Sequence, residues 1–92
     1  MRFENQHVVV TGGTRGLGRA MSLSFLAEGA VVHATYRSDA ASADGLREAA
    51  GEHAERLVTH AVDVTDAAAV EAFWGSFEDT PISVLVNNAG IR

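Results

Sequence analysis

The sequence of 92 residues contains no cysteine and no lysine, so all seven of its basic residues are arginines. The lack of cysteine excludes disulfides and thiolate metal sites. The four histidines share no metal-binding spacing such as His-x-x-x-His, and we expect no metal site. A formal net charge of −5 argues against a nucleic-acid partner, which would require clustered positive charge. No apolar run has signal-peptide length or approaches the roughly 18 residues of a membrane span, so we expect a cytoplasmic chain with no membrane partner.

Four short apolar runs, rich in β-branched residues, are present at residues 8–10, 31–34, 57–62 and 84–86. They alternate little with polar residues, which is typical of strands in a parallel sheet that is covered on both faces. Helical periodicity fills the intervals between them, at residues 16–28, 39–52 and 66–77. The apolar stripe of the first helix is Leu17, Ala20, Met21 and Phe25. The stripe of the third, which we expect to pack against the sheet, is Val70, Phe73, Trp74 and Phe77.

The order β-α-β-α-β-α-β predicts an α/β fold, the N-terminal half of a doubly wound parallel sheet of the Rossmann type. Right-handed crossovers give the strand order 3-2-1-4. Residues 84–86 then form an edge strand that carries no lysine, proline or charge. Because an exposed apolar edge favours aggregation, we expect another surface to cover it.

A glycine-rich loop, Thr11-Gly12-Gly13-Thr14-Arg15-Gly16-Leu17-Gly18, connects the first predicted strand to the first predicted helix. Glycine lets the backbone turn tightly and approach a pyrophosphate, and the amides and dipole of a helix N-terminus favour the negative charge. The alternative is a plain strand-to-helix turn. The order strand, loop, helix favours dinucleotide binding.

The spacing Gly12-x-x-x-Gly16-x-Gly18 resembles that of the classical short-chain dehydrogenase/reductase family, and two further segments match. Asp63-Val64 ends the third predicted strand, where the family places an Asp-Val or Asn-Val pair beside the adenine ring. Asn87-Asn88-Ala89-Gly90 ends the fourth and is similar to the family's Asn-Asn-Ala-Gly motif. The resemblance covers all 92 residues, which correspond to the first part of a typical member, and is greatest to 3-oxoacyl-acyl-carrier-protein reductases and polyketide ketoreductases. It implies these cofactor-binding residues: Gly12, Thr14, Arg15, Gly16, Leu17, Gly18, Tyr36, Arg37, Ser38, Asp63, Val64, Asn88, Ala89 and Gly90.

The end of the second predicted strand indicates which nicotinamide cofactor the chain binds. An NAD-binding domain usually carries a carboxylate there for the ribose 2′-hydroxyl, and here Tyr36 takes that place and Arg37 follows. An arginine pairs with a 2′-phosphate, whereas a carboxylate repels it. Arg15 adds a second cation where the helix dipole disfavours one. The alternative for each arginine is a solvated side chain, and together they favour NADP(H).

The residues that would perform the chemistry are absent from the sequence. The resemblance implies a serine, and a tyrosine and lysine spaced Tyr-x-x-x-Lys, but the only tyrosine is Tyr36, and Ala40 stands at the fourth position after it. We therefore expect residues 1–92 to be the NADP(H)-binding N-terminal part of a single Rossmann domain, without catalytic residues. A missing C-terminal portion or a second polypeptide would complete an oxidoreductase, oligomeric when complete, that reduces a small-molecule carbonyl. The alternative is a non-catalytic NADP(H)-binding module.

Overall fold

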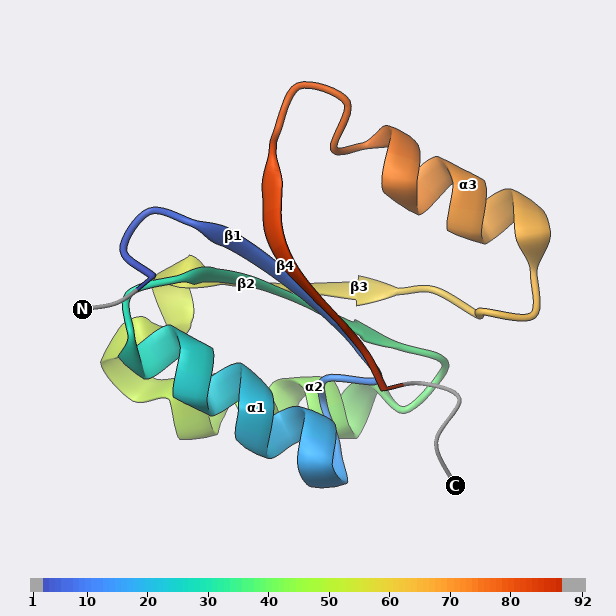
Figure 1. The fold of residues 1–92 in the computed structure, drawn as a ribbon. Coiled ribbons are helices and arrows are strands. Elements are labelled where there is room, and N and C mark those ends of the chain that lie inside the picture. The colour runs from blue at the N-terminus through green and yellow to red at the C-terminus, as the bar shows by residue number, and fades with distance from the viewer. Residues whose placement is uncertain (1–2, 89–92) are drawn as a thin grey trace.

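The valine-rich segments form a four-stranded parallel sheet with the order β3-β2-β1-β4, which confirms the predicted fold (Figure 1). The computed structural model describes residues 3–88. The strands are β1 (His7–Thr11), β2 (Val31–Tyr36), β3 (Leu57–Ala61) and β4 (Ile82–Asn87).

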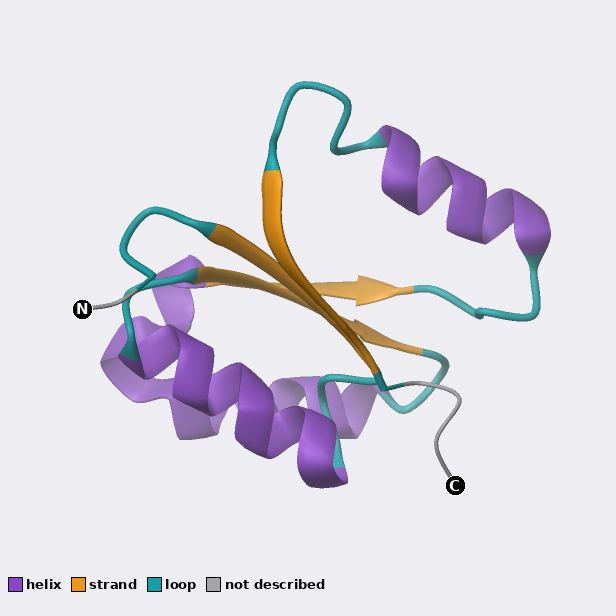
Figure 2. Ribbon diagram, viewed as in Figure 1, coloured by secondary structure: helices purple, strands orange, loops and turns teal. Residues whose placement is uncertain are grey.

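Helices cover both faces of this sheet (Figure 2). Helices α1 (Gly16–Ala27) and α2 (Ala40–Ala50) lie on one face, and α3 (Ala67–Gly75) lies on the other. Asp39 caps α2 and Asp66 caps α3, each through a carboxylate that accepts backbone amide hydrogen bonds. Within residues 3–88, no helix is long and apolar enough to cross a membrane.

The second helix ends earlier than its periodicity predicts. Gly51 has a φ of 56°, a left-handed conformation that stops α2, and the chain continues as the 3-10 helix η1 (Gly51–Arg56). The Arg56 guanidinium donates hydrogen bonds to the carbonyl oxygens of Leu26 and Ala30, at 2.8 and 3.0 Å. These bonds attach η1 to the end of α1 and to the start of β2.

The buried face of α1 differs from the apolar stripe that was predicted for the first helix. The buried positions of α1 are Gly18, Ser22 and Leu26, whereas Leu17 is 64% exposed. The small residues Gly18 and Ser22 let the helix approach the glycine loop closely. The Ser22 hydroxyl donates to the carbonyl oxygens of Gly13 and Gly18, each at 2.9 Å, so its burial leaves no unsatisfied donor.

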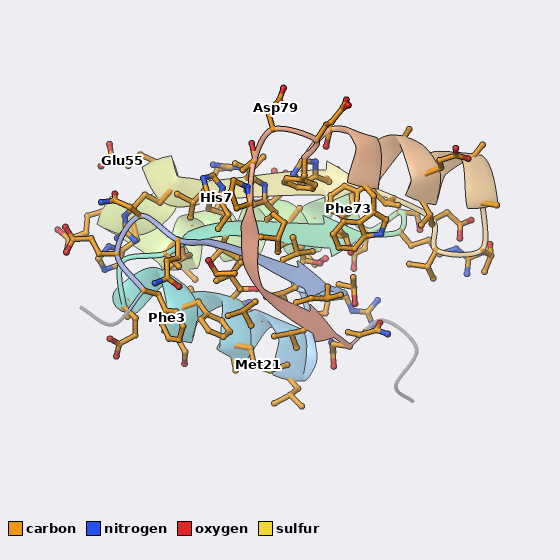
Figure 3. All side chains as sticks on the ribbon, turned by 45° about the horizontal axis from the view of Figure 1, so that its top comes forward. Phe3, His7, Met21, Glu55, Phe73 and Asp79 are labelled. Carbon is orange, nitrogen blue, oxygen red and sulfur yellow. The ribbon has the colours of Figure 1, made fainter. Side chains whose placement is uncertain are left out.

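On the other face, Phe73 of α3 and Phe77, which follows the helix, pack against the sheet and are buried together with Val9 and Val62. Figure 3 shows Phe73 and His7 on this face, and Phe3 and Met21 on the α1 face. Trp74 was expected in the same core, but it is 37% exposed. Its ring contacts Phe73 edge-on, and the buried aromatic pair of this cluster is Phe73 and Phe77.

Three histidines from neighbouring strands form a ladder on the α3 face, which we call the histidine ladder: His7, His33 and His60. Nδ1 of His7 lies 3.0 Å from Nε2 of His33, and Nδ1 of His33 lies 3.2 Å from Nε2 of His60. The edge of the Phe77 ring covers His33, with centroids 4.7 Å apart. Burial, and then the charges of His60 and His7, lower the pKa of His33 to about 4.

Candidate dinucleotide-binding site

The loops that follow the four parallel strands meet at one edge of the sheet and surround a cavity of about 550 Å³. Open α/β sheets bind ligands at this edge, where the carboxyl ends of the strands meet. The volume is in the usual range for a small-molecule site. The cavity is lined by Gly12, Thr14, Arg15, Gly16, Leu17, Thr35, Tyr36, Arg37, Ser38, Asp39, Val62, Asp63, Val64, Thr65 and Asn88.

The glycine loop is held in a turn that requires glycine at two positions. Gly12 has a φ of 64° and Gly16 a φ of 54°, both in the left-handed region. The Gly12 amide donates to Oγ1 of Thr35 at 3.1 Å, and the Gly13 amide donates to the Thr35 carbonyl oxygen at 3.1 Å. Gly18 lies beneath the loop, where an added Cβ would meet the Gly12 carbonyl oxygen. The close packing of loop and helix therefore depends on glycine at position 18.

The N-terminus of α1 opens into this cavity without a capping side chain. Arg15 occupies the N-cap position and makes no side-chain cap hydrogen bond, and the first turn contains no acidic residue. Helix N-termini carry free amides and a partial positive charge, which favour a bound anion. The first turn of α1 thus fits the pyrophosphate of a dinucleotide.

Two guanidinium groups face the cavity from different elements, and each is paired with a carboxylate. Nη1 of Arg15 lies 3.8 Å from Oδ2 of Asp39, and Nε of Arg37 lies 3.5 Å from Oδ2 of Asp63. Tyr36 stands at the end of β2, where NAD-binding domains usually carry a carboxylate. Arg15 and Arg37 thus place two guanidinium groups at the cavity, each beside a carboxylate.

Asp63 is fixed by the turn that follows β3. Its Oδ1 accepts hydrogen bonds from the hydroxyl of Thr65 at 2.6 Å and from the amide of Thr65 at 2.9 Å. These two bonds, and then the charge of Arg37, lower the pKa of the Asp63 carboxyl. The residue therefore starts the turn toward α3 and also presents a carboxylate oxygen to the cavity.

Asn88 connects the end of β4 to the glycine loop. Its amide donates to Oγ1 of Thr11 at 2.9 Å, and its Nδ2 donates to the Gly12 carbonyl oxygen at 3.3 Å. Oδ1 of Asn87 accepts a 3.3 Å hydrogen bond from the Thr11 hydroxyl. These bonds hold the ends of β1 and β4 together next to Gly12 and Asn88, which line the cavity.

Comparison with known proteins gives the family. Residues 6–92 match the family described as short chain dehydrogenase. The chain belongs to the short-chain dehydrogenase family. Its four-stranded parallel sheet, with the helices on both faces, therefore corresponds to the N-terminal half of that family's Rossmann fold.

Several members of the short-chain dehydrogenase family are similar over nearly the whole chain. A 3-oxoacyl-[acyl-carrier-protein] reductase FabG from Vibrio harveyi is 38% identical, covering 99% of this chain and 36% of its own length. An L-rhamnose 1-dehydrogenase (NADP(+)) from Thermoplasma acidophilum is 33% identical, covering 97% of this chain and 36% of its own length. The apo glucose dehydrogenase of Caenorhabditis elegans superimposes with a TM-score of 0.84 at 27% identity, covering 96% and 39%. The chain thus spans little more than a third of the length of these relatives.

The structure brings together most of the residues predicted for the cofactor site. Eleven line the cavity: Gly12, Thr14, Arg15, Gly16, Leu17, Tyr36, Arg37, Ser38, Asp63, Val64 and Asn88. Gly18 is buried beneath them, and Ala89 and Gly90 lie outside the described residues. Sequence reasoning missed Thr35, Asp39, Val62 and Thr65, which also line the cavity. The position of Thr35 directly before Tyr36 was the available signal for one of them.

Within residues 3–88, no three histidine or acidic side chains are grouped so that they could hold a metal ion. The histidine ladder lies on the α3 face, and none of its members lines the cavity. The polar chemistry of the described site is therefore that of hydroxyls, amides, guanidiniums and carboxylates.

Proposed function

We propose that this chain is the NADP(H)-binding part of a short-chain oxidoreductase that reduces a carbonyl to an alcohol. The observation that carries the proposal is the pair of arginines, Arg15 and Arg37, beside an uncapped helix N-terminus, with Tyr36 in place of the usual carboxylate. An arginine near the end of the second strand accommodates the 2′-phosphate of NADP. The relative from Thermoplasma acidophilum, whose name specifies NADP(+), supports the same preference.

The residues of this chain would hold the cofactor in four groups. The glycine loop from Gly12 to Gly18 would bind the pyrophosphate through its amides and the N-terminus of α1. Arg15, Arg37 and Ser38 would bind the 2′-phosphate. The adenine would lie against Asp63 and Val64, and the segment that begins at Asn88 and continues to Ala89 and Gly90 would pass close to the nicotinamide ribose.

When bound, NADPH supplies the hydride, and the residues of this chain bind and orient the cofactor. The sequence contains no lysine and no Tyr-x-x-x-Lys pair. The acid that protonates the alkoxide would therefore come from another segment. We propose that a C-terminal portion or a second polypeptide provides it. The relative from Vibrio harveyi makes a 3-oxoacyl thioester the first substrate to test. The complete enzyme would be an oligomer in the cytoplasm.

Replacing Arg37 by aspartate tests the cofactor assignment. A hydrogen bond to a charged group contributes about 1.5–3 kcal/mol, so Arg37→Asp should raise the Kd for NADPH at least about tenfold. The Kd for NADH should change much less, because NADH has no 2′-phosphate. Calorimetry with both nucleotides measures the two constants on the same preparation. Equal NADPH affinity in the variant and the original chain would remove Arg37 from the phosphate site.

A non-catalytic binding module would share this nucleotide affinity, so a second measurement separates the two functions. Native mass spectrometry of the chain as it is isolated from its own cells reports whether a stoichiometric second polypeptide is bound. A partner that contains Tyr-x-x-x-Lys, together with carbonyl-dependent oxidation of NADPH by the complex, supports the enzyme. A lone 92-residue species that retains NADPH supports the module.

A further inference from the structure

Each of the two arginines that face the cavity already has a carboxylate partner in the protein itself. Arg15 is paired with Asp39 and Arg37 with Asp63, and all four residues line the cavity. Two positive and two negative charges leave this part of the site with no net charge. An incoming 2′-phosphate therefore meets two carboxylates in addition to two guanidiniums.

Asp39 has little freedom to move away from that phosphate. Its Oδ1 accepts the amide hydrogen bond of Ser42 at 3.1 Å, and its carbonyl oxygen accepts the Ser42 hydroxyl at 2.8 Å. The Ser42 hydroxyl also lies 3.0 Å from Oγ1 of Thr14, a buried residue of the glycine loop. The carboxylate is thus fixed by its role as the N-cap of α2, while its Oδ2 faces Arg15.

The negative charge of Asp39 affects a ligand that carries a 2′-phosphate more than one that has only a ribose hydroxyl there. A fixed carboxylate repels a second anion in the same cavity and competes for the same guanidinium, but it has no such effect on a ribose hydroxyl. Asp39 and Arg15 are both exposed, so water and salt screen the effect and keep it modest.

Resting on the proposed function, we propose that Asp39 is a specificity-determining residue. It is a built-in counter-ion of Arg15 that lowers the preference of the site for 2′-phosphorylated nucleotides. Removing its charge, while keeping its hydrogen bonds, should increase that preference.

Asp39→Asn makes this change with little effect on the fold. Asparagine is as good an N-cap as aspartate, and its side-chain oxygen can still accept the Ser42 amide. Asp44→Asn is the matched control, because it removes one negative charge from the same helix at a position that does not line the cavity. Far-ultraviolet circular dichroism and the urea midpoint show whether each variant keeps the original fold.

The probes are 2′,5′-ADP and 5′-AMP, which differ only in the 2′-phosphate and occupy only the adenosine end of the site. We expect Asp39→Asn to bind 2′,5′-ADP roughly threefold to fivefold more tightly than the original chain, a gain typical of an exposed charge interaction. The affinity for 5′-AMP should stay within about twofold, and Asp44→Asn should change neither constant by more than that. The gain should shrink as the salt concentration rises.

The outcomes separate this inference from the proposed function. If the original chain prefers 2′,5′-ADP and Asp39→Asn has the same preference, the inference is wrong and the cofactor assignment stands. If the original chain shows no preference but Asp39→Asn does, Asp39 has the proposed effect and the original chain is not selective for NADP(H). If neither protein distinguishes the two probes, both are wrong. An equal gain for both probes, or an equal gain in Asp44→Asn, also overturns the role of Asp39.

Discussion

Replacing Gly18 by alanine tests whether the glycine loop is held by packing against α1. Alanine is normally favoured over glycine within a helix by about 1 kcal/mol, so propensity alone predicts a more stable protein. Here the new Cβ would meet the Gly12 carbonyl oxygen and lie 2.7 Å from Nδ2 of Asn88. Because the obstacle is loop backbone, the loop itself must move.

The size of the loss follows from these contacts. Overfilling a packed site costs about 1–3 kcal/mol. Moving Gly12 also weakens the hydrogen bonds that it makes to Thr35 and Asn88, each of which contributes about 0.5–1.5 kcal/mol. After the gain in helix propensity, we expect Gly18→Ala to lose about 1–5 kcal/mol of unfolding free energy.

Gly16→Ala is the matched control on the same loop. An added Cβ at Gly16 meets nothing within 4 Å, so only its φ of 54° opposes alanine. A left-handed conformation costs a residue with a Cβ about 1–2 kcal/mol. Urea unfolding, followed by the fluorescence of Trp74 and by circular dichroism, measures both losses. Equal stability of Gly18→Ala and the original chain, or a greater loss in Gly16→Ala, would refute the packing of loop on helix described above.

Two further predictions concern other parts of the chain. The pKa of His33 is lowered to about 4, so the unfolded chain takes up this proton more readily than the folded one. Stability should therefore be retained above the ordinary pKa of about 6.5 and fall by up to about 3 kcal/mol as the pH drops from there to about 4. Unfolding free energies measured across that range should depend less steeply on pH in His33→Gln than in the original chain, with the slope that remains coming from His60, whose pKa burial also lowers. Equal slopes in the two proteins would contradict the burial effect. Gly45→Ala, in the interior of α2 with only a distant contact for its Cβ, should raise stability by about 0.5–1 kcal/mol, and a lower thermal midpoint would count against that geometry.

The sheet and its order followed from sequence because each strand is a short run of β-branched residues separated by helical periodicity. Strand 1 was predicted at residues 8–10, and the structure extends it from His7 to Thr11. The glycine loop could also be predicted from sequence, because Gly12 and Gly16 occupy positions where the backbone requires a left-handed conformation. Such local requirements are visible in the order of residues alone.

The burial and contacts of residues whose environment depends on tertiary packing could not be predicted from sequence in the same way. Leu17 fits the apolar stripe of α1, but the helix turns Gly18 and Ser22 toward the sheet and leaves Leu17 exposed at the cavity. Asp39 fits a solvated helix face, yet as the N-cap of α2 it lies at the end of β2 and faces Arg15. Periodicity reports which side of a helix is polar and does not report what stands opposite that side.

Calorimetric titration of the unaltered chain with NADPH and with NADH tests most directly whether the chain recognises the 2′-phosphate of NADP(H). Two arginines at the phosphate end predict an NADPH affinity at least about tenfold higher than that for NADH, since each charge-assisted contact contributes about 1.5–3 kcal/mol. The difference should diminish as salt is added. Equal affinity for the two nucleotides, or tighter binding of NADH, would contradict the account.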